Sequence, residues 1–377
     1  MTAWNIITGH YPPQPGGVSD YTRLIAHGLA EAGDRVSVWT SRFDTGAVNG
    51  EVVRVNRLPD HFGRAGLVIL NRELHRERAA RVLVEYVPHA FGMKAMNVPL
   101  CMLLLRHRRR DITVMFHEVA YPIERGQQMR RNLLGIVNRA MAAILARAAS
   151  RIFVAAEAWK EALGRLAPRG CDIRWLPVPS TIGVSSDRAA ILDKRARFAE
   201  PGVKLLGHFG SYGPLVAARL KPALISILST RSDVRIILIG RNSETFRDSF
   251  AREHRLLASR VIATGPLDEA DVSASIGACD FMIQPYPDGI TSRNTSALAG
   301  LAYRKPVVTT TGRWSETLWA RSGAVMLAPD GDPDALAHCA FELMDNRERA
   351  NTMGCAAIKL YHEVFDVRHT IDALRNA

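Results

Sequence analysis

The sequence predicts an α/β protein with two doubly wound domains, each built on a parallel β-sheet. Short runs of β-branched and other apolar residues alternate with longer helical segments along the chain, which is the βαβ pattern of parallel sheets. A chain of 377 residues also exceeds what one ordinary core accommodates, and it suits two domains of roughly 150–200 residues each.

Seven strands are expected in the first half of the chain and six in the second. The first-half strands are expected at residues 4–8, 36–40, 52–58, 82–87, 112–116, 152–155 and 173–178, with helices at 19–32, 97–109, 128–149 and 157–166. Ser19 is a candidate N-cap for the first helix, and Gly33 is a candidate stop.

The linker-rich residues 177–187 separate the two halves, so the domain boundary is expected near residue 180. After a polar, helix-like stretch the alternation resumes. The second-half strands are expected at 204–209, 235–239, 261–264, 281–285, 306–310 and 324–327, with helices at 214–228, 245–254, 269–278, 295–303 and 334–346. We therefore expect domains at 1–180 and 181–355, and a final helix at 356–377 that packs back on the first domain.

Composition indicates a folded, water-soluble protein. Apolar residues make up 47% of the chain and charged residues 23%. The longest apolar run, residues 98–105, is far shorter than the ~20 residues that span a bilayer. No basic region followed by an apolar stretch stands at the N-terminus, and the five cysteines stand singly. We therefore expect a cytoplasmic protein with reduced thiols and no signal peptide.

The net charge of +12 implies anionic partners. Nucleic acid is disfavoured, because the chain has no zinc-finger spacing, RNP-like aromatic motif or helix-turn-helix pattern. A basic run at 106–110 follows the apolar segment 98–105, and arginines alternate with aliphatic residues over 129–151. Such a helix can lie on an anionic membrane surface, at the inner face of the membrane, or it can be a packed helix with one solvated basic face.

Ligand residues are expected in the loops that follow the strands, because doubly wound sheets bind ligands at the carboxyl ends of their strands. The first such loop, residues 10–21, carries Gly16 and Gly17 before a helix. Paired glycines let the backbone approach a ligand closely, and a helix N-terminus favours negative charge. The alternative is a simple turn. The spacing is not GxGxxG, which argues against a dinucleotide site.

This loop and several later motifs resemble glycosyltransferase family 4. The pattern Pro-Pro-X-Pro-Gly-Gly-Val-X-X-Tyr at 12–21 resembles the opening of that family, and residues 151–154, 237–240, 265–267, 278–280 and 285–311 continue the likeness in order. The resemblance implies a retaining, metal-independent enzyme of the GT-B fold, with two Rossmann-like domains facing a central cleft. It also implies an acceptor-binding N-terminal domain and a nucleotide-sugar-binding C-terminal domain, with Gly16 and Gly17 near the donor diphosphate.

The second loop departs from the family pattern. Gly210 and Ser211 lie between a strand and a helix N-terminus, which in principle forms a cradle for phosphate. The family usually carries an arginine here and a Lys-Gly shortly afterwards, and this chain has neither. The positive charge for a diphosphate must therefore come from another part of the chain.

The third loop, residues 284–296, is the most informative. Asp288-Gly289 resembles the family's Glu-Gly, and backbone amides around Gly289 are expected to assist donor binding. The family's second glutamate, eight positions later, is replaced by Ser296. Instead, hydroxyls and one cation gather at a predicted helix start, where they could bind a diphosphate: Ser292, Arg293, Asn294, Thr295 and Ser296. The alternative is simple N-capping by Ser292 or Asn294.

Two strand ends of the first domain supply candidates for sugar and acceptor contacts. His117 matches a family histidine near the donor sugar, and Glu118 beside it is a candidate acceptor contact or base. With Asp288, these form the candidate catalytic set. His89 and Tyr11 are candidates for the acceptor side.

No metal or cofactor is expected. The Asp330-Gly331-Asp332 sequence resembles a metal-binding DxD, but Asp332-Pro333 also fits an N-cap with proline at the first helical position. The function expected is transfer of a sugar from a nucleoside diphosphate sugar, as co-substrate, to a small-molecule, glycan or lipid-linked acceptor. A GT-B-fold epimerase or phosphorylase and a non-catalytic nucleotide-sugar-binding protein remain alternatives. The sequence does not indicate an oligomeric state.

Overall fold

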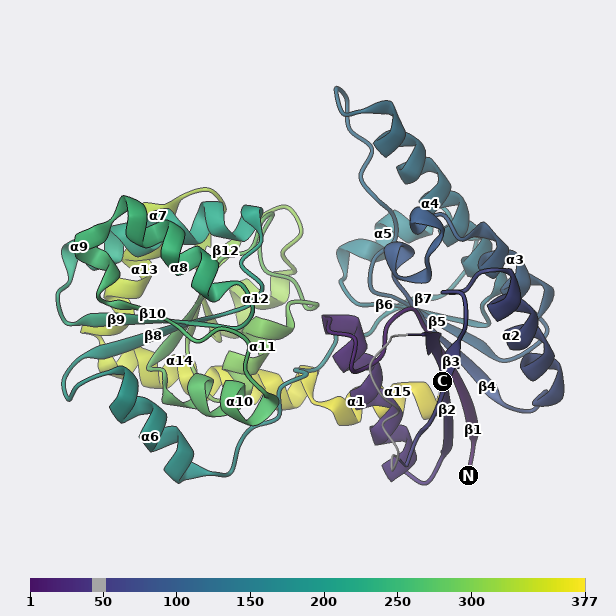
Figure 1. Ribbon diagram of the computed structural model, residues 1–377, viewed down its shortest axis with the longest axis horizontal. Helices are drawn as coiled ribbons and strands as arrows, with labels where there is room; N and C mark the ends of the chain where they lie inside the picture. Colours follow the sequence, from purple (N-terminus) through teal and green to yellow (C-terminus); the bar gives the residue numbers. More distant parts are fainter. Residues whose placement is uncertain (43–51, 377) are drawn as a thin grey trace. The chain divides into compact units, whose positions relative to one another are not determined.

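The computed structural model describes residues 1–42 and 52–376 (Figure 1). The chain forms two compact units. The first comprises Met1–Val178 and Val367–Ala377, and the second comprises Pro179–Asp366. The chain therefore returns to the first unit at Val367, eleven residues later than the start of the expected final helix at 356.

The first unit contains a parallel sheet of seven strands in the order β3-β2-β1-β4-β5-β6-β7 among its described residues. Its strands are β1 (Ala3–Thr8), β2 (Arg35–Ser41), β3 (Arg54–Leu58), β4 (Arg81–Tyr86), β5 (Ile112–Phe116), β6 (Arg151–Val154) and β7 (Ile173–Trp175). The predicted strands all form, with small shifts at their ends. Most of their apolar residues are buried, as parallel sheets covered by helices require, whereas those of the edge strand β7 are half-buried.

Helices cover both faces of this sheet. One face packs against four helices through a single apolar cluster: α2 (Arg64–Arg76), α3 (Val98–Arg106), α4 (Met129–Ala148) and α5 (Ala158–Gly164). On β1 and β2 lies α1 (Gly17–Glu31), which packs against α15 (Val367–Asn376). Gly28 lets these two helices approach closely, because a Cβ there would lie 2.9 Å from Ile371 Cδ1. Short 3₁₀ turns, η1 (Pro88–Phe91) and η2 (Met93–Ala95), follow β4.

The start of α1 differs from the prediction. Gly16 is the N-cap, and the helix begins at Gly17. Ser19 lies inside the first turn, where its buried hydroxyl donates to the Gln14 carbonyl at 2.5 Å. Ser19 therefore closes the preceding loop instead of capping the helix. Gly33 does follow the helix end, with a φ of +87° that favours glycine.

The second unit contains a six-stranded parallel sheet in the order β10-β9-β8-β11-β12-β13. Its strands are β8 (Lys204–Phe209), β9 (Val234–Ile239), β10 (Val261–Ala263), β11 (Phe281–Gln284), β12 (Val307–Thr311) and β13 (Val325–Pro329). One face packs against α7 (Pro214–Thr230), α8 (Ser243–Glu253) and α13 (Pro333–Asp345).

The opposite face of this sheet carries α10 (Glu269–Ala278) and α11 (Thr295–Ala302). Next to these helices pack α6 (Arg188–Phe198), which contacts α10, and α14 (Arg347–Leu360), which contacts α11. The remaining elements are α9 (Arg255–Ala258), α12 (Thr317–Ser322) and the π-helical turn η3 (Tyr361–Phe365). Trp319 of α12 stacks on Phe365 of η3, with ring centroids 5.5 Å apart.

Each sheet has one point at which the strand order reverses. In the first unit β1 lies between β2 and β4, and in the second β8 lies between β9 and β11. The connections that leave the two central strands at such a point run to opposite faces of the sheet, so a crevice opens at their carboxyl ends. This is where a doubly wound sheet binds its ligands.

His208 lies close to this point in the second unit. Its ring is buried in β8, with 3% of the residue exposed, and packs edge-on against Tyr212. Nδ1 lies 2.8 Å from the Ile283 carbonyl of β11, and burial lowers the pKa of His208 to about 4. The neutral ring therefore donates through Nδ1–H. Nε2 has no hydrogen-bond partner among the described residues.

This burial predicts a loss of stability at mildly acidic pH. The unfolded chain binds a proton on His208 as the pH falls through ~6.5, whereas the folded chain does so only near pH 4. The contribution of His208 to the free energy of unfolding is thus complete above pH ~6.5, and about 3 kcal/mol of it is lost by pH 4. Urea unfolding across this pH range should show a shallower decline for His208→Gln. The matched control, His338→Gln on the exposed side of α13, should keep the wild-type slope.

Candidate functional site

The candidate residues follow the carboxyl ends of strands at, or next to, the points of strand-order reversal. In the first unit, Gly16 and Gly17 follow β1, His89 follows β4, and His117 follows β5. In the second unit, Gly210 follows β8, and the loop from Asp288 to Ser296 follows β11. Each unit therefore gathers its candidates at one edge of its own sheet.

Asp288 is tied to two neighbours in the second unit. Its backbone has a φ of +64°, and its amide donates to Asp330 Oδ2 at 2.9 Å. Its half-exposed carboxylate pairs with Arg313, whose Nε lies 2.9 Å from Oδ1. Because surface ion pairs contribute only about 0–1 kcal/mol, a ligand can replace Arg313 as the partner of Asp288 at small cost.

Gly289 is required by packing. A Cβ at this position would lie 2.2 Å from the Gly312 amide nitrogen, and its φ is +92°. Its own amide donates to the Tyr286 carbonyl, and that of Ile290 donates to the Thr310 carbonyl. These amides are therefore engaged within the protein, which corrects the expectation that Gly289 offers a free donor to a ligand.

Ser292 does not face solvent, contrary to expectation. It has no exposed surface, and its hydroxyl donates to Glu316 Oε1 at 2.8 Å. Its amide lies 3.1 Å from both oxygens of the same carboxylate. Trp319 Nε1 supplies a further donor at 2.7 Å. Ser292 therefore holds the buried carboxylate of Glu316, 24 residues away in the chain, and its hydroxyl is not available to a phosphate as predicted.

The rest of this loop presents Arg293 to solvent at the start of α11. Asn294 is the N-cap residue by position, but its Oδ1 accepts from the Thr291 amide and hydroxyl at 2.6 and 2.8 Å, so it closes the loop. Thr295 opens the helix and is half-buried. Ser296 shares a hydrogen bond of 2.6 Å with the Tyr286 hydroxyl. Arg293, Asn294 and Thr295 thus surround a helix N-terminus that favours anions.

The Gly210 loop lies beside this segment on the neighbouring strand. The Gly210 amide donates to the Ile239 carbonyl, and Ser211 is exposed. The loop leads into α7, a long helix that begins at Pro214 and has no side-chain cap. Its first N–H groups are left for solvent or a ligand.

Two arginines at this edge escaped the sequence reasoning. Arg313 follows β12 and lies over the ring of Trp314, 4.9 Å from its centroid. Arg219, in the second turn of α7, pairs through two nitrogens with Asp330. Position after a strand could have pointed to Arg313. No local signal marks Arg219, because its partner lies 111 residues later.

In the first unit, the two glycines have open surroundings and Tyr11 does not. A Cβ at Gly16 or Gly17 would meet nothing within 4 Å. Tyr11 is 1% exposed and belongs to the core. Its expected role as an acceptor contact is therefore corrected, because the buried ring is not exposed to an acceptor.

His117 is paired with a carboxylate that the sequence analysis overlooked. Its Nε2 lies 2.7 Å from Glu85 Oε2, and the side chains are 8% and 0% exposed. His89 and Glu118 also come together, with Nδ1 of the histidine 3.6 Å from Oε2 of the glutamate, and both are well exposed. His10 is close to His61 and His89, and burial, followed by repulsion from these two rings, lowers the pKa of His10.

No group of three or more histidine, cysteine or acidic side chains suited to a metal ion occurs in the described part of the chain. The Asp330-Gly331-Asp332 sequence has other roles. Asp330 binds Arg219 and the Asp288 amide. Asp332 caps α13 by accepting from the Ala335 amide at 2.9 Å, with Pro333 in the first turn, which confirms the N-cap prediction.

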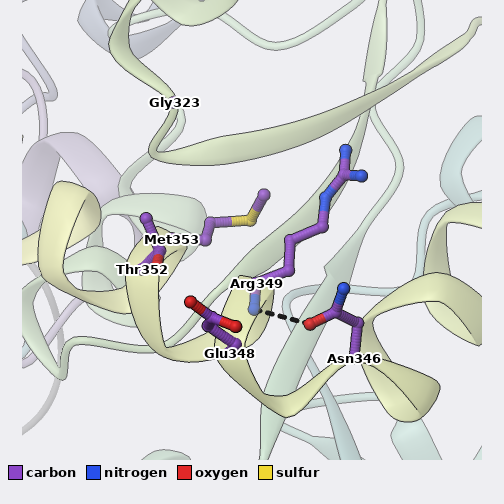
Figure 2. Close-up of a pocket in the computed structure, with 6 residues that line it drawn as sticks. All are labelled: Gly323, Asn346, Glu348, Arg349, Thr352 and Met353. Carbon is purple, nitrogen blue, oxygen red and sulfur yellow. Dashed lines mark hydrogen bonds between the residues drawn. The ribbon is translucent and has the colours of Figure 1, made fainter.

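A surface pocket of about 420 Å³ lies away from these residues (Figure 2). It is formed where Gly323 approaches the start of α14, and Asn346 caps that helix by accepting from the Arg349 amide at 2.9 Å. Gly323 precedes β13, so the pocket is at the amino end of that strand, whereas the candidate residues follow carboxyl ends. Its lining consists of Gly323, Asn346, Glu348, Arg349, Thr352 and Met353.

Two family models match the chain in order, one in each unit. Residues 15–179 match the model described as Glycosyltransferase Family 4, and residues 200–346 match Glycosyl transferases group 1. The chain is a family 4-like glycosyltransferase. It is therefore an enzyme, and the sheets, loops and helix starts described above are the parts of a glycosyltransferase. No curated protein matches the chain.

Solved structures share the fold of this glycosyltransferase at low sequence identity. WaaG, a glycosyltransferase involved in lipopolysaccharide biosynthesis, is 16% identical with a TM-score of 0.71, over 98% of this chain and 99% of that one. Anabaena HepE in complex with UDP and glucose is 16% identical with a TM-score of 0.73, over 100% and 98%. A putative UDP-N-acetylglucosamine 2-epimerase from Listeria monocytogenes is 13% identical with a TM-score of 0.57, over 97% and 98%. The two parallel sheets have the GT-B architecture.

The Glu316 cluster makes a specific prediction for stability. Glu316→Ala leaves the Ser292 amide and hydroxyl and the Trp319 indole N–H buried without an acceptor. The expected loss in the free energy of unfolding is about 3 kcal/mol, since each unpaired buried donor is costly. Urea unfolding measures it. Glu200→Ala, which removes a side chain that is 73% exposed, should change stability by less than about 1 kcal/mol. Equal losses in the two variants would contradict the role given to Glu316.

Proposed function

We propose that this glycosyltransferase moves a sugar from a nucleoside diphosphate sugar to an acceptor hydroxyl, with retention of configuration. In the reaction the bond between the anomeric carbon and the diphosphate oxygen breaks, a bond to the acceptor oxygen forms, and the acceptor hydroxyl loses its proton. Negative charge grows on the departing diphosphate. The acceptor is a small molecule, a glycan or a lipid-linked sugar, as in bacterial polysaccharide, glycolipid or secondary-metabolite synthesis.

The diphosphate is assigned to the carboxyl edge of the second sheet. Gly210 and Ser211 precede the uncapped start of α7, and Arg293, Asn294 and Thr295 surround the start of α11. The family obtains positive potential from an arginine and a lysine that this chain lacks. Here two helix N-termini and Arg293 provide it. Gly16 and Gly17, which have space around them, are assigned to the same group. Ser296, predicted at the diphosphate, is instead assigned to hold Tyr286, because the two hydroxyls share a hydrogen bond.

The sugar and acceptor are assigned to four side chains. Asp288 binds sugar hydroxyls after exchanging its ion pair with Arg313. His117 contacts the sugar, and the Glu118 carboxylate, beside His89, contacts the acceptor or takes its proton. No cofactor or metal is assigned to the reaction, and the co-substrate is the nucleotide sugar itself.

One observation carries the proposal most directly. The Gly210 loop and the Arg293 loop follow β8 and β11, the two strands at which the order of the second sheet reverses. The N-termini of α7 and α11 thus lie at the carboxyl ends of the two strands at the reversal, where a doubly wound sheet can bind a diphosphate. Among the similar structures, those of HepE contain UDP, UDP-glucose, or UDP and glucose, which supports a nucleotide sugar as the donor class here.

The experiment that tests this function is incubation with a panel of labelled nucleotide sugars and analysis of the products. Transfer to an acceptor or slow donor hydrolysis, with an α-linked donor giving an α-linked product, supports the proposal. Interconversion of the nucleotide sugar without an acceptor would indicate an epimerase, and a requirement for inorganic phosphate would indicate a phosphorylase. Nucleotide-dependent thermal stabilisation without turnover would indicate a binding protein.

Arg293 provides the sharpest test of the diphosphate site. Arg293→Ala should raise the dissociation constant for the nucleoside diphosphate about 10-fold or more, because a charge-assisted hydrogen bond is worth about 1.5–3 kcal/mol. Calorimetry measures it. Arg252→Ala, in the last turn of α8, makes the same charge change away from the carboxyl edge and should leave the affinity unchanged. Equal affinities for wild type and Arg293→Ala would remove this arginine from the site.

We also propose that the protein docks on an anionic membrane surface at the cytoplasmic face, through α4. The C-terminal half of this helix packs in the core through Met141 and Leu145. Its N-terminal half extends away from the sheet of the first unit (Figure 1), and exposes Met129, Leu133 and Ile136 by 88%, 56% and 56%. These residues lie at spacings of four and three, which place them on one helix face.

Basic residues accompany this apolar face. Arg125, Arg130 and Arg131 are exposed in the same part of the chain, together with the apolar side chains of Tyr121 and Ile123 in the preceding segment. Apolar side chains beside arginines suit the boundary between acyl chains and anionic headgroups. Arg110, in the basic run at residues 106–110, has a different role, since it donates to the carbonyls of Leu74, Glu77 and Ala80. No helix in the described residues is long and apolar enough to cross a membrane.

Substitution of the α4 face should weaken membrane binding. The triple variant Met129→Ser, Leu133→Ser, Ile136→Ser should sediment with vesicles containing phosphatidylglycerol at least 10-fold less than wild type, and binding should fall with added salt. The matched control replaces three exposed leucines of the second unit by serine, namely Leu192, Leu215 and Leu256. Equal binding of the two triple variants, or binding to neutral vesicles alone, would contradict this surface.

A further inference from the structure

Glu85 and His117 form a buried side-chain pair in the first unit. Glu85 lies on β4 and its side chain is completely buried, while His117 follows the neighbouring strand β5. Glu85 Oε2 lies 2.7 Å from His117 Nε2, and Oε1 has no partner among the described residues. His117 is therefore the one described hydrogen-bond partner of this carboxylate.

The imidazole ring is held in one orientation by its surroundings. The ring of Tyr21, from α1, packs edge-on against it, with centroids 4.8 Å apart. The His117 amide donates to the Tyr86 carbonyl, and the His117 carbonyl accepts from Trp159 Nε1 at 3.2 Å. Burial and then the nearby charge of Glu85 raise the pKa of Tyr21, so the tyrosine stays neutral. The ring is therefore kept with Nε2 toward Glu85.

This arrangement determines which ring nitrogen is left for a ligand. With Glu85 as the acceptor of this hydrogen bond, Nε2 carries the proton that lies between the two side chains. In the neutral ring, Nδ1 then has a lone pair and accepts. No hydrogen bond to Nδ1 is found within the described residues, and this nitrogen is not among their fully buried unpaired atoms.

We propose that Glu85 is a positioning residue that fixes His117 as the Nε2–H tautomer, so that Nδ1 accepts a hydrogen bond from a hydroxyl of the sugar substrate. The inference rests on the proposed function, because it takes the contact between His117 and the sugar from there. A hydroxyl is the matching ligand group, since the oxygens of an ionised phosphate carry no proton to donate. Glu85 itself touches no substrate in this arrangement.

Nitrogen NMR of the ligand-free enzyme, labelled with ¹⁵N-histidine, tests the tautomer without any substrate. The wild-type His117 signals should show a protonated Nε2 and an unprotonated Nδ1. In Glu85→Gln the amide can donate as well as accept, so the preference should be lost and the Nδ1 signal should move toward the protonated form. A wild-type ring that is protonated on Nδ1, or a tautomer that Glu85→Gln leaves unchanged, would overturn the proposal.

Kinetics with a matched variant test the consequence for the sugar. His117→Gln retains an N–H that can reach Glu85 but has no atom at the position of Nδ1, so it should fold normally. Glu85→Gln and His117→Gln should each lower kcat/KM for transfer about 10-fold, and the double variant should lose no more than His117→Gln alone. Additive losses would mean that Glu85 acts independently of His117, which would overturn the proposal.

The two experiments separate the inference from the function on which it rests. The predicted tautomer together with normal transfer by His117→Gln would reject the sugar contact of His117 and thus the role of Nδ1, while the pairing with Glu85 stood. Absence of transfer by the wild-type enzyme with every donor would reject the proposed function, and the tautomer would still be measured.

Discussion

The reversal of strand order in each sheet is the constraint on which the candidate site depends. All described pairings are parallel, so every strand ends at the same edge of its sheet, and the chain leaves neighbouring central strands toward opposite faces. At β8 and β11 this places the starts of α7 and α11 at one edge of one sheet. A helix start carries partial positive charge, so two of them at one edge favour an anion there.

Buried carboxylates organise both units. Glu316 gathers the Ser292 amide and hydroxyl and the Trp319 indole, and so holds the loop that presents Arg293. Glu85 is paired with His117 in the other unit. A carboxylate removed from water is costly unless donors surround it, so each donor is constrained to one geometry. The side chains that we propose to face ligands are thereby held by buried groups.

The ion pairs of Asp288 and Asp330, at the carboxyl edge of the second sheet, are more exposed than these buried carboxylates. The Asp288–Arg313 pair is well exposed, and Asp330 bridges Arg219 and the Asp288 amide more deeply. The Asp288–Arg313 pair can exchange partners at small cost. The Asp330 carboxylate, by contrast, accepts from the Asp288 amide and so keeps the Asp288 backbone at a positive φ. Rigid support beneath an exchangeable surface pair suits the nucleotide-sugar donor that we propose for this edge.

The order of strands and helices could be predicted from local pattern, and so could the sheet edges that carry the candidate residues. Strands β5 and β8 and helix α10 have the predicted bounds, and the Asp332 cap was recognisable because its donor lies three residues away. The family resemblance was also visible, because Gly-rich loops and strand ends are short motifs.

The state of individual polar side chains was decided by tertiary structure alone. Tyr11 sits in the core, and Ser292 binds Glu316 although its sequence context suits an exposed helix cap. Glu85 reads in the sequence as one residue of a strand, yet it fixes His117, 32 residues later. Periodicity reports which segments are apolar, but hydrogen bonds between residues far apart depend on how the strands and loops come together, and no local pattern encodes them.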